Sequence, residues 1–175
     1  MHYLKTRNIS IEKKKRWAEG YLDKELGKQF EIIRPRFPLS EDSKYNDWKI
    51  NFERYIPFLK NNVILIGSSL GGIFLAKYLS ENKFPKKILA TYIICPPYDN
   101  TLPDEDLAGG FKLKDDLSLI EKNCKNTTFI FSKDDDVVPV SHAEKYKSKL
   151  KNKNLLFIKV KMVTSVFQNF QRLLR

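Results

Sequence analysis

The sequence is poor in the residues that build disulfide frameworks and metal sites. Its 175 residues include only 2 cysteines, Cys95 and Cys124, and only 2 histidines, His2 and His142. Two cysteines are too few for the disulfide framework of a small secreted fold or for a structural zinc site. We therefore predict a protein without a bound metal and without a cofactor.

Long hydrophobic runs are also missing. The longest apolar stretch, residues 63–76, is interrupted by glycines and serines, and no window approaches the ~20 apolar residues of a membrane span. The first ten residues lack the apolar core of a secretory signal. These absences predict a cytoplasmic protein with no membrane partner.

Negative charge is in short supply. The chain has 32 Lys and Arg against 21 Asp and Glu, a net charge of +11, which can indicate a nucleic-acid partner. Arg is scarce beside Lys, however, and the Lys residues are spread along the whole chain. Phosphate and base recognition favour the bidentate fork of Arg. We expect a solvated basic surface, and nucleic acid binding is the weaker alternative.

The chain does contain a regular alternation of apolar runs and amphipathic segments. Continuous apolar runs are typical of strands buried on both faces, and apolar residues at helical spacing indicate helices. Strands are predicted over residues 30–33, 63–66, 91–95, 128–131 and 155–160, and helices over 11–27, 48–59, 70–80, 117–122 and 143–150. This pattern predicts an α/β fold in a single domain, residues 1–175: a doubly wound, mainly parallel sheet with helices on both faces.

A serine stands at one predicted strand-to-helix junction. Gly67, Ser69 and Gly71 form the pattern G-x-S-x-G, directly after the apolar run at 63–66. In a nucleophile elbow the serine is held in a strained turn, and the two glycines avoid collisions. The backbone N–H of Leu70 would then face a developing oxyanion. A glycine-rich turn that binds a phosphate, or nothing, is the alternative reading of the same residues.

A serine nucleophile needs a base that is oriented by an acid. Three aspartates follow the predicted strand at 128–131, where the carboxyl ends of parallel strands build sites. We select Asp135 as the acid, with Asp136 second. A solvated loop or a helix cap is the alternative interpretation of this acidic run.

The segments GSSLGG and SKDDDVVPVSHAEKY, with the pair Asp47-Trp48 about twenty residues before the elbow, resemble a known family. It is the family of small α/β-hydrolase-fold serine hydrolases that includes retinoblastoma-binding serine hydrolase and YdeN, and the resemblance covers roughly residues 29–160. It implies Ser69 as nucleophile and Asp135 as acid. The family usually has a histidine where this chain has Ser68.

The base is the point at which the chain departs from this family. The family's catalytic histidine lies in a Gly-His-Phe-like turn after the last strand, and residues 161–175 contain no histidine. His142 follows Asp135 by only seven residues, and one loop rarely supplies both acid and base. We therefore expect His142 to be an ordinary residue on the surface of a helix.

The tail at 161–175 is atypical because it contains no acidic residue and resembles neither a capped helix nor a strand. We hypothesise that it is read in a shifted frame. A GTC codon at Val163 would restore Gly-His-Phe after a shift of one nucleotide, and any other codon there would contradict the idea.

The front of the chain departs from the family as well. The family begins with a central strand whose loop supplies the second oxyanion N–H, and nothing before Phe30 matches that strand. We predict that the sheet is truncated at its N-terminal side and lacks one central strand. Unpaired ladder groups would then make the chain marginally stable, which a thermal melt would test.

The sequence thus predicts a serine hydrolase of small acyl substrates (esters, amides or thioesters), impaired because its catalytic histidine is absent. The main alternative is a non-catalytic protein-interaction module that keeps the hydrolase fold.

Overall fold

The computed structural model describes residues 23–24, 27, 29–37, 42–103, 106–150 and 156–160. Most of the predicted helix at 11–27 and the whole tail at 161–175 lie outside these residues. The chain divides into two compact units, residues 1–36 and 37–175, and each is described by itself. The prediction of one domain over residues 1–175 stays a prediction.

In the first unit, the predicted strand at 30–33 is wrong. Residues 30–33 belong to no helix or strand. In this unit Arg34 forms an ion pair with Asp23, with Nη2 and Oδ1 3.0 Å apart. A strand persists only where its N–H and C=O groups pair with a neighbour. The apolar pattern at 30–33 supplies a face to bury but not that partner.

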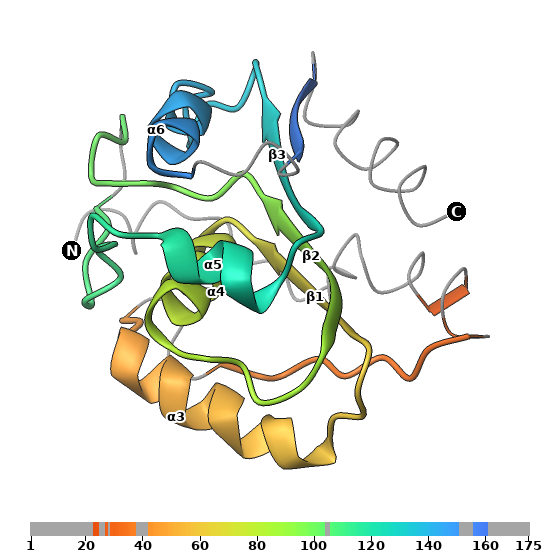
Figure 1. The fold of residues 1–175 in the computed structure, drawn as a ribbon. Coiled ribbons are helices and arrows are strands. Elements are labelled where there is room, and N and C mark those ends of the chain that lie inside the picture. Colours follow the sequence, from red (N-terminus) through yellow and green to blue (C-terminus); the bar gives the residue numbers. More distant parts are fainter. Residues whose placement is uncertain are drawn as a thin grey trace. The chain divides into compact units, whose positions relative to one another are not determined.

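The second unit contains a parallel sheet of four strands in the order β1-β2-β3-β4 (Figure 1). They are β1 (Val63–Ser68), β2 (Ile88–Ile94), β3 (Thr127–Ser132) and β4 (Leu156–Val160). Each strand pairs in parallel with the next. The predicted α/β class with a parallel sheet is confirmed, and four of the predicted strands are found within three residues of their expected bounds.

The described helices of this unit are α3 (Tyr45–Tyr55), α4 (Leu70–Glu81), α5 (Ser118–Asn123) and α6 (His142–Lys149). The helix predicted at 48–59 ends earlier than expected, and a 3₁₀ turn η1 (Ile56–Phe58) follows it. The reason is Pro57, which has no N–H for an α-helical hydrogen bond but is accepted at the start of a new turn.

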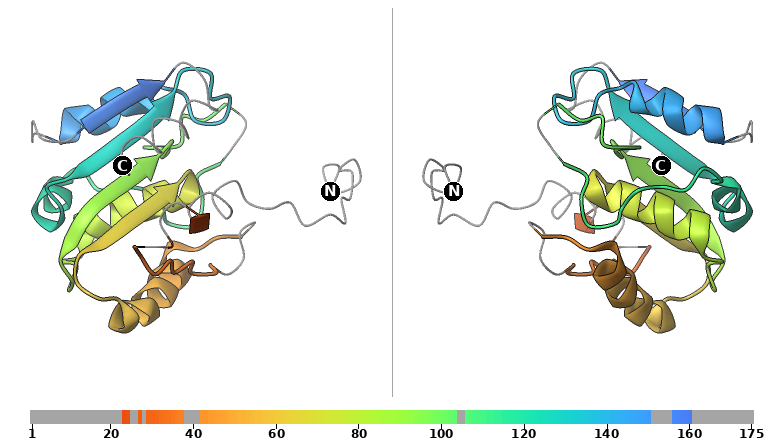
Figure 2. Two further views of the ribbon diagram at one scale, coloured as in Figure 1. Left: turned by 90° about the vertical axis from the view of Figure 1, so that its right-hand side faces the viewer. Right: turned by 90° about the vertical axis from the view of Figure 1, so that its left-hand side faces the viewer.

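Helices α4 and α6 lie on the same face of the sheet (Figure 2). Gly67, Ile93 and Phe129 are neighbours in register and therefore face the same side. A Cβ atom on Gly67 would meet Leu75 of α4, and Phe129 packs against Tyr146 of α6. The physical reason is that the strand order never reverses in this part of the chain, so right-handed crossovers all fall on one face. A helix on the other face remains a prediction for residues outside those described.

An aromatic cluster fixes α4 in place. Phe74 contacts Trp48 and Phe52 of α3 with ring centroids 5.8 and 5.4 Å apart, and Tyr78 contacts Phe52 at 5.0 Å. These rings are buried, and edge-to-face pairs of this kind add stability beyond their buried area. The N-terminus of α4, where Ser69 lies, is therefore anchored by the core.

Candidate functional site

Ser69 connects β1 to α4 in a strained conformation. Its φ is 51° and its ψ is −120°, a region that non-glycine residues rarely adopt. Its N–H donates to the Ile94 carbonyl at 2.8 Å, and its own carbonyl accepts from the N–H groups of Gly72 and Ile73 at 2.8 and 3.1 Å. The side chain is exposed. Strain held by surrounding hydrogen bonds is typical of functional turns, and it presents the hydroxyl to solvent at the helix N-terminus.

The two glycines of the motif have different roles. A Cβ atom on Gly67 would lie 2.3 Å from the backbone oxygen of Gly71, an impossible contact. A Cβ atom on Gly71 would meet no heavy atom within 4 Å. The expected steric reason therefore holds for Gly67 and is wrong for Gly71, whose carbonyl, rather than its missing side chain, lies against Gly67.

Leu70 is the first residue of α4. The first four N–H groups of a helix have no intrahelical carbonyl to bind, and they carry the positive end of the helix dipole. The N–H of Leu70 is thus suited to an oxygen that gains negative charge beside Ser69.

The acidic loop after β3 gives its three aspartates different surroundings. Asp135 is half-buried, and its Oδ1 accepts hydrogen bonds from the N–H groups of Val137 and Val138 at 3.1 and 2.8 Å. Asp134 is tied to the hydroxyl of Ser132, and Asp136 is exposed. Asp135 is therefore the aspartate of this loop whose carboxylate is held by backbone N–H groups, as in a structural turn.

Cys95 lies between the elbow and the acidic loop, and the sequence reasoning did not select it. It follows β2, the strand between β1 and β3, and its N–H donates to the Ile130 carbonyl at 2.7 Å. It is buried, with a φ of 43°. Burial, and after it the influence of the Asp135 carboxylate, raise the pKa of its thiol to about 12. Its position directly after a buried strand, at the edge where parallel strands end, was the available signal.

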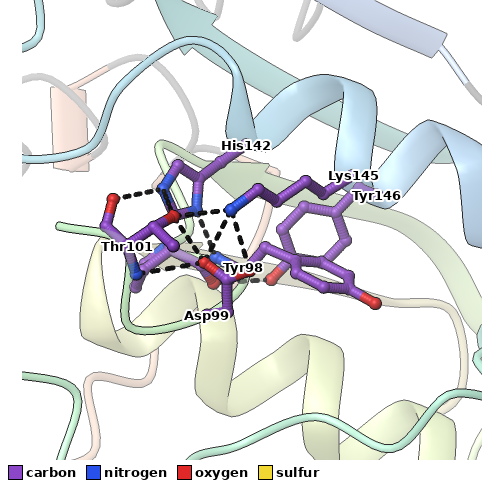
Figure 3. A network of polar contacts seen from close by, with 7 residues as sticks. Tyr98, Asp99, Thr101, His142, Lys145 and Tyr146 are labelled. Carbon is purple, nitrogen blue, oxygen red and sulfur yellow. Dashed lines mark hydrogen bonds and ion pairs between the residues drawn. The ribbon is translucent and has the colours of Figure 1, made fainter.

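His142 is not on a helix surface, so that prediction is wrong. It is the first residue of α6 and is fully buried. Its Nδ1 accepts the N–H of Tyr98 at 2.8 Å, and its Nε2 lies 3.2 Å from the Thr101 carbonyl (Figure 3). With Nδ1 as acceptor, the ring is assigned as the neutral tautomer that donates from Nε2. Both nitrogens are engaged, so in this arrangement His142 cannot accept a proton from Ser69.

The same network fixes the segment that follows Cys95. Lys145 Nζ lies 2.8 Å from both carboxylate oxygens of Asp99, and Tyr146 donates its hydroxyl proton to the Pro97 carbonyl at 2.9 Å. Burial alone would raise the pKa of Asp99, but hydrogen bonds from Lys145 and Thr101 outweigh it and lower the pKa to about 2. The chain after β2 is thus fastened to α6, and Pro96 borders the elbow, with its Cβ 3.1 Å from the Cβ position of Gly72.

Within the described ranges, no group of three or more His, Cys, Asp or Glu side chains is arranged to hold a metal ion. None of the helices in those ranges has the length and apolar character to cross a membrane.

The comparisons with known proteins agree with this architecture. The family model described as "Serine hydrolase" matches residues 13–159. The structure of the ydeN gene product from B. subtilis is similar over 80% of this chain and 81% of its own, with a TM-score of 0.61 and 16% identity.

Two further solved structures are similar at lower scores. The match to the meta-cleavage product hydrolase from Pseudomonas fluorescens covers 79% of this chain and 73% of that hydrolase, with a TM-score of 0.52 and 13% identity. The match to an alpha/beta hydrolase from a Medee basin deep-sea metagenome library covers 73% of this chain and 53% of that enzyme, with a TM-score of 0.50 and 16% identity. At these identities the likeness shows the fold alone. No curated protein matches the chain by sequence.

Proposed function

Since this chain belongs to the serine hydrolase family, we propose that it cleaves the ester, amide or thioester bond of a small acyl substrate with Ser69 as nucleophile. The observation that carries the proposal is the conformation of Ser69. An exposed hydroxyl stands on a strained turn between a parallel strand and the N-terminus of a buried helix. This is the setting that a nucleophile elbow requires.

In the proposed reaction, Ser69 Oγ attacks the acyl carbon while the N–H of Leu70 stabilises the oxyanion. The bond to the leaving group then breaks, the leaving group takes up a proton, and an acyl ester of Ser69 remains. Water adds to that ester and releases the carboxylic acid and the free serine. Asp135 would orient the group that accepts the serine proton.

The proton acceptor is the weak point of this site. His142, the histidine within the described ranges, has both ring nitrogens engaged with the 98–101 segment. Since His142 does not serve as the base, we propose that the proton passes to water or hydroxide. Loss of one member of a catalytic triad typically lowers kcat by about 10⁴ or more, so we propose a slow hydrolase.

A fluorophosphonate probe tests the nucleophile directly. We expect slow labelling of the folded wild-type protein at one serine, with no labelling of Ser69→Ala. Ser68→Ala is the matched control, because Ser68 is the adjacent exposed serine and its loss should leave labelling unchanged. The measurement is the rate of adduct formation, with the modified residue mapped by mass spectrometry.

Failure has two forms. Equal labelling of wild type and Ser69→Ala would show that another residue reacts. No labelling of a protein whose circular dichroism shows it folded would instead favour a non-catalytic protein-interaction module. The complete engagement of His142 within the fold is the observation that keeps this second candidate in consideration.

A further inference from the structure

We propose that the edge of the sheet at the amino ends of its strands binds an anionic lipid surface. We call this surface the basic edge, and it consists of residues 58–62, 82–89 and 122–126 together with Leu156. Its lysines would meet the anionic headgroups, and its exposed apolar side chains would enter the headgroup boundary. The contact goes beyond the chemistry proposed at Ser69, which follows β1 at the carboxyl ends of the strands.

The parallel sheet brings together lysines that are dispersed along the sequence. Because the strands pair in parallel, their amino ends lie at one edge (Figure 2). The segments that lead into β1, β2 and β3, residues 59–62, 82–87 and 122–126, contain six lysines and no acidic residue. The segments that follow β2 and β3, residues 95–103 and 133–141, contain four aspartates and one lysine. Positive charge therefore gathers at the amino ends of the strands.

Hydrogen bonds join the segments of the basic edge to one another. Asn61 Oδ1 accepts the N–H of Lys87 at 3.0 Å, and the N–H of Val63 donates to the carbonyl of Lys87 at 3.0 Å. Asn126 Nδ2 donates to the carbonyl of Leu89 at 3.2 Å. The segments before β1, β2 and β3 are thus connected, so the lysines that they carry belong to one continuous surface.

The lysines of the basic edge are available to an anionic partner. Five of the six are exposed, and Lys86 is half-buried. In the part of the chain that the structure describes, ion pairs engage other lysines, such as Lys77, Lys145 and Lys149. No acidic residue of that part pairs with Lys83, Lys86, Lys87, Lys122 or Lys125. A cluster of four or more such cations attracts an anionic membrane.

Exposed apolar side chains occur at the same edge. Phe58 is 77% exposed, Leu89 is 43% exposed and Leu156 is 46% exposed. Phe58 ends the turn before β1, Leu89 is the second residue of β2, and Leu156 is the first residue of β4. A single exposed apolar residue is ordinary on a protein surface. Three of them beside a lysine cluster have the composition of a surface that lies at a lipid interface.

The composition of the basic edge favours lipid over nucleic acid. It contains no arginine, whose planar fork suits phosphate and base recognition, and Phe58 is its one exposed aromatic side chain for stacking on a base. Lysine is a compact point charge that needs no bidentate geometry to be attracted by anionic headgroups. We therefore revise the expectation of no membrane partner, which rested on the lack of a long apolar run, because a peripheral contact needs none.

Vesicle flotation with the full chain tests the lysines. We expect binding to vesicles of phosphatidylcholine with phosphatidylserine, much weaker binding to phosphatidylcholine alone, and release as the salt concentration rises. Lys83→Gln combined with Lys87→Gln should lower the vesicle partition coefficient about 25-fold, or about fivefold for each lysine. Lys44→Gln combined with Lys133→Gln is the matched control. It removes the same charge outside the basic edge and should leave binding unchanged.

The apolar part of the contact has its own variant. Phe58→Ala should lower the partition coefficient about tenfold, because the ring no longer leaves water on binding. Since Phe58 is largely exposed, the thermal melt of the variant should match that of wild type. Val137→Ala is the matched control, because Val137 is an exposed apolar residue in the acidic loop after β3.

Three results would overturn the proposal. They are no binding to the phosphatidylserine vesicles, equal losses for the two lysine pairs, and tighter binding to a single-stranded RNA oligonucleotide than to the vesicles at the same salt concentration. The last result would assign the basic edge to nucleic acid. None of these measurements depends on labelling of Ser69, so a failure of the proposed hydrolase function leaves them decisive.

Discussion

Replacing Gly67 by alanine will cost most or all of the stability of the second unit. The new methyl group would lie 2.3 Å from the Gly71 oxygen and 2.8 Å from its carbonyl carbon. Both are backbone atoms of α4, and α4 is held by the aromatic cluster around Phe74. Neither the backbone of β1 nor that of α4 can shift without disturbing the core, so we expect the free energy of unfolding to fall by more than about 4 kcal/mol. That is a large part of the 5–15 kcal/mol that typically stabilises a domain.

Gly71→Ala is the matched control for this substitution. The methyl group would enter open space, and alanine is favoured over glycine inside a helix by about 1 kcal/mol. Urea denaturation followed by circular dichroism should therefore show Gly71→Ala at or above wild-type stability and Gly67→Ala far below it. Similar midpoints for the two variants would contradict this account of the turn.

Removing the imidazole of His142 has the second largest expected effect. The ring is fully buried and satisfies the N–H of Tyr98 and the carbonyl of Thr101. His142→Ala leaves a cavity and two unpaired backbone groups, and we expect it to lose about 3 kcal/mol in the free energy of unfolding. The segment after β2 would lose its attachment to α6 at the same time.

His142 should also make stability depend on pH. Burial lowers the pKa of His142 below its ordinary 6.5, and the charge of Lys145 adds to this, while the Thr101 carbonyl and Asp99 oppose it. The unfolded chain therefore binds a proton at a higher pH than the folded chain does. The contribution of neutral His142 to the free energy of unfolding is fully present above pH 6.5. It decreases as the pH falls below 6.5 toward the lowered pKa of His142 in the folded protein.

Thermal melts between pH 5 and 8 measure this dependence. His142→Gln loses the buried ring and its contacts, so it should be less stable than wild type at pH 8. Glutamine does not titrate in that range, so the melting temperature of the variant should change less as the pH falls. Asp99 titrates near 2 in the folded state, well below this window, and His2 is present in both proteins. The difference between the two curves is therefore due to His142. Parallel curves would show that the buried ring does not titrate as described.

The sheet was largely predictable because local signals and tertiary context agree there. The apolar runs at 63–66 and 128–131 are the centres of β1 and β3. The helix after Ser69 begins where the motif requires it. The run at 30–33 is also mostly apolar and forms no strand, because pairing with a neighbour is a non-local event that a short run cannot encode.

By itself, the sequence determined the α/β class, the turn at Ser69 and the acidic loop after β3, since each depends on residues close together in the chain. Only the tertiary structure decided that His142 is buried against the 98–101 segment, that Gly71 has open space, and that Cys95 is buried with a positive φ. Those facts depend on which distant segments come together, and burial and hydrogen-bond partners are properties of that assembly rather than of any local pattern.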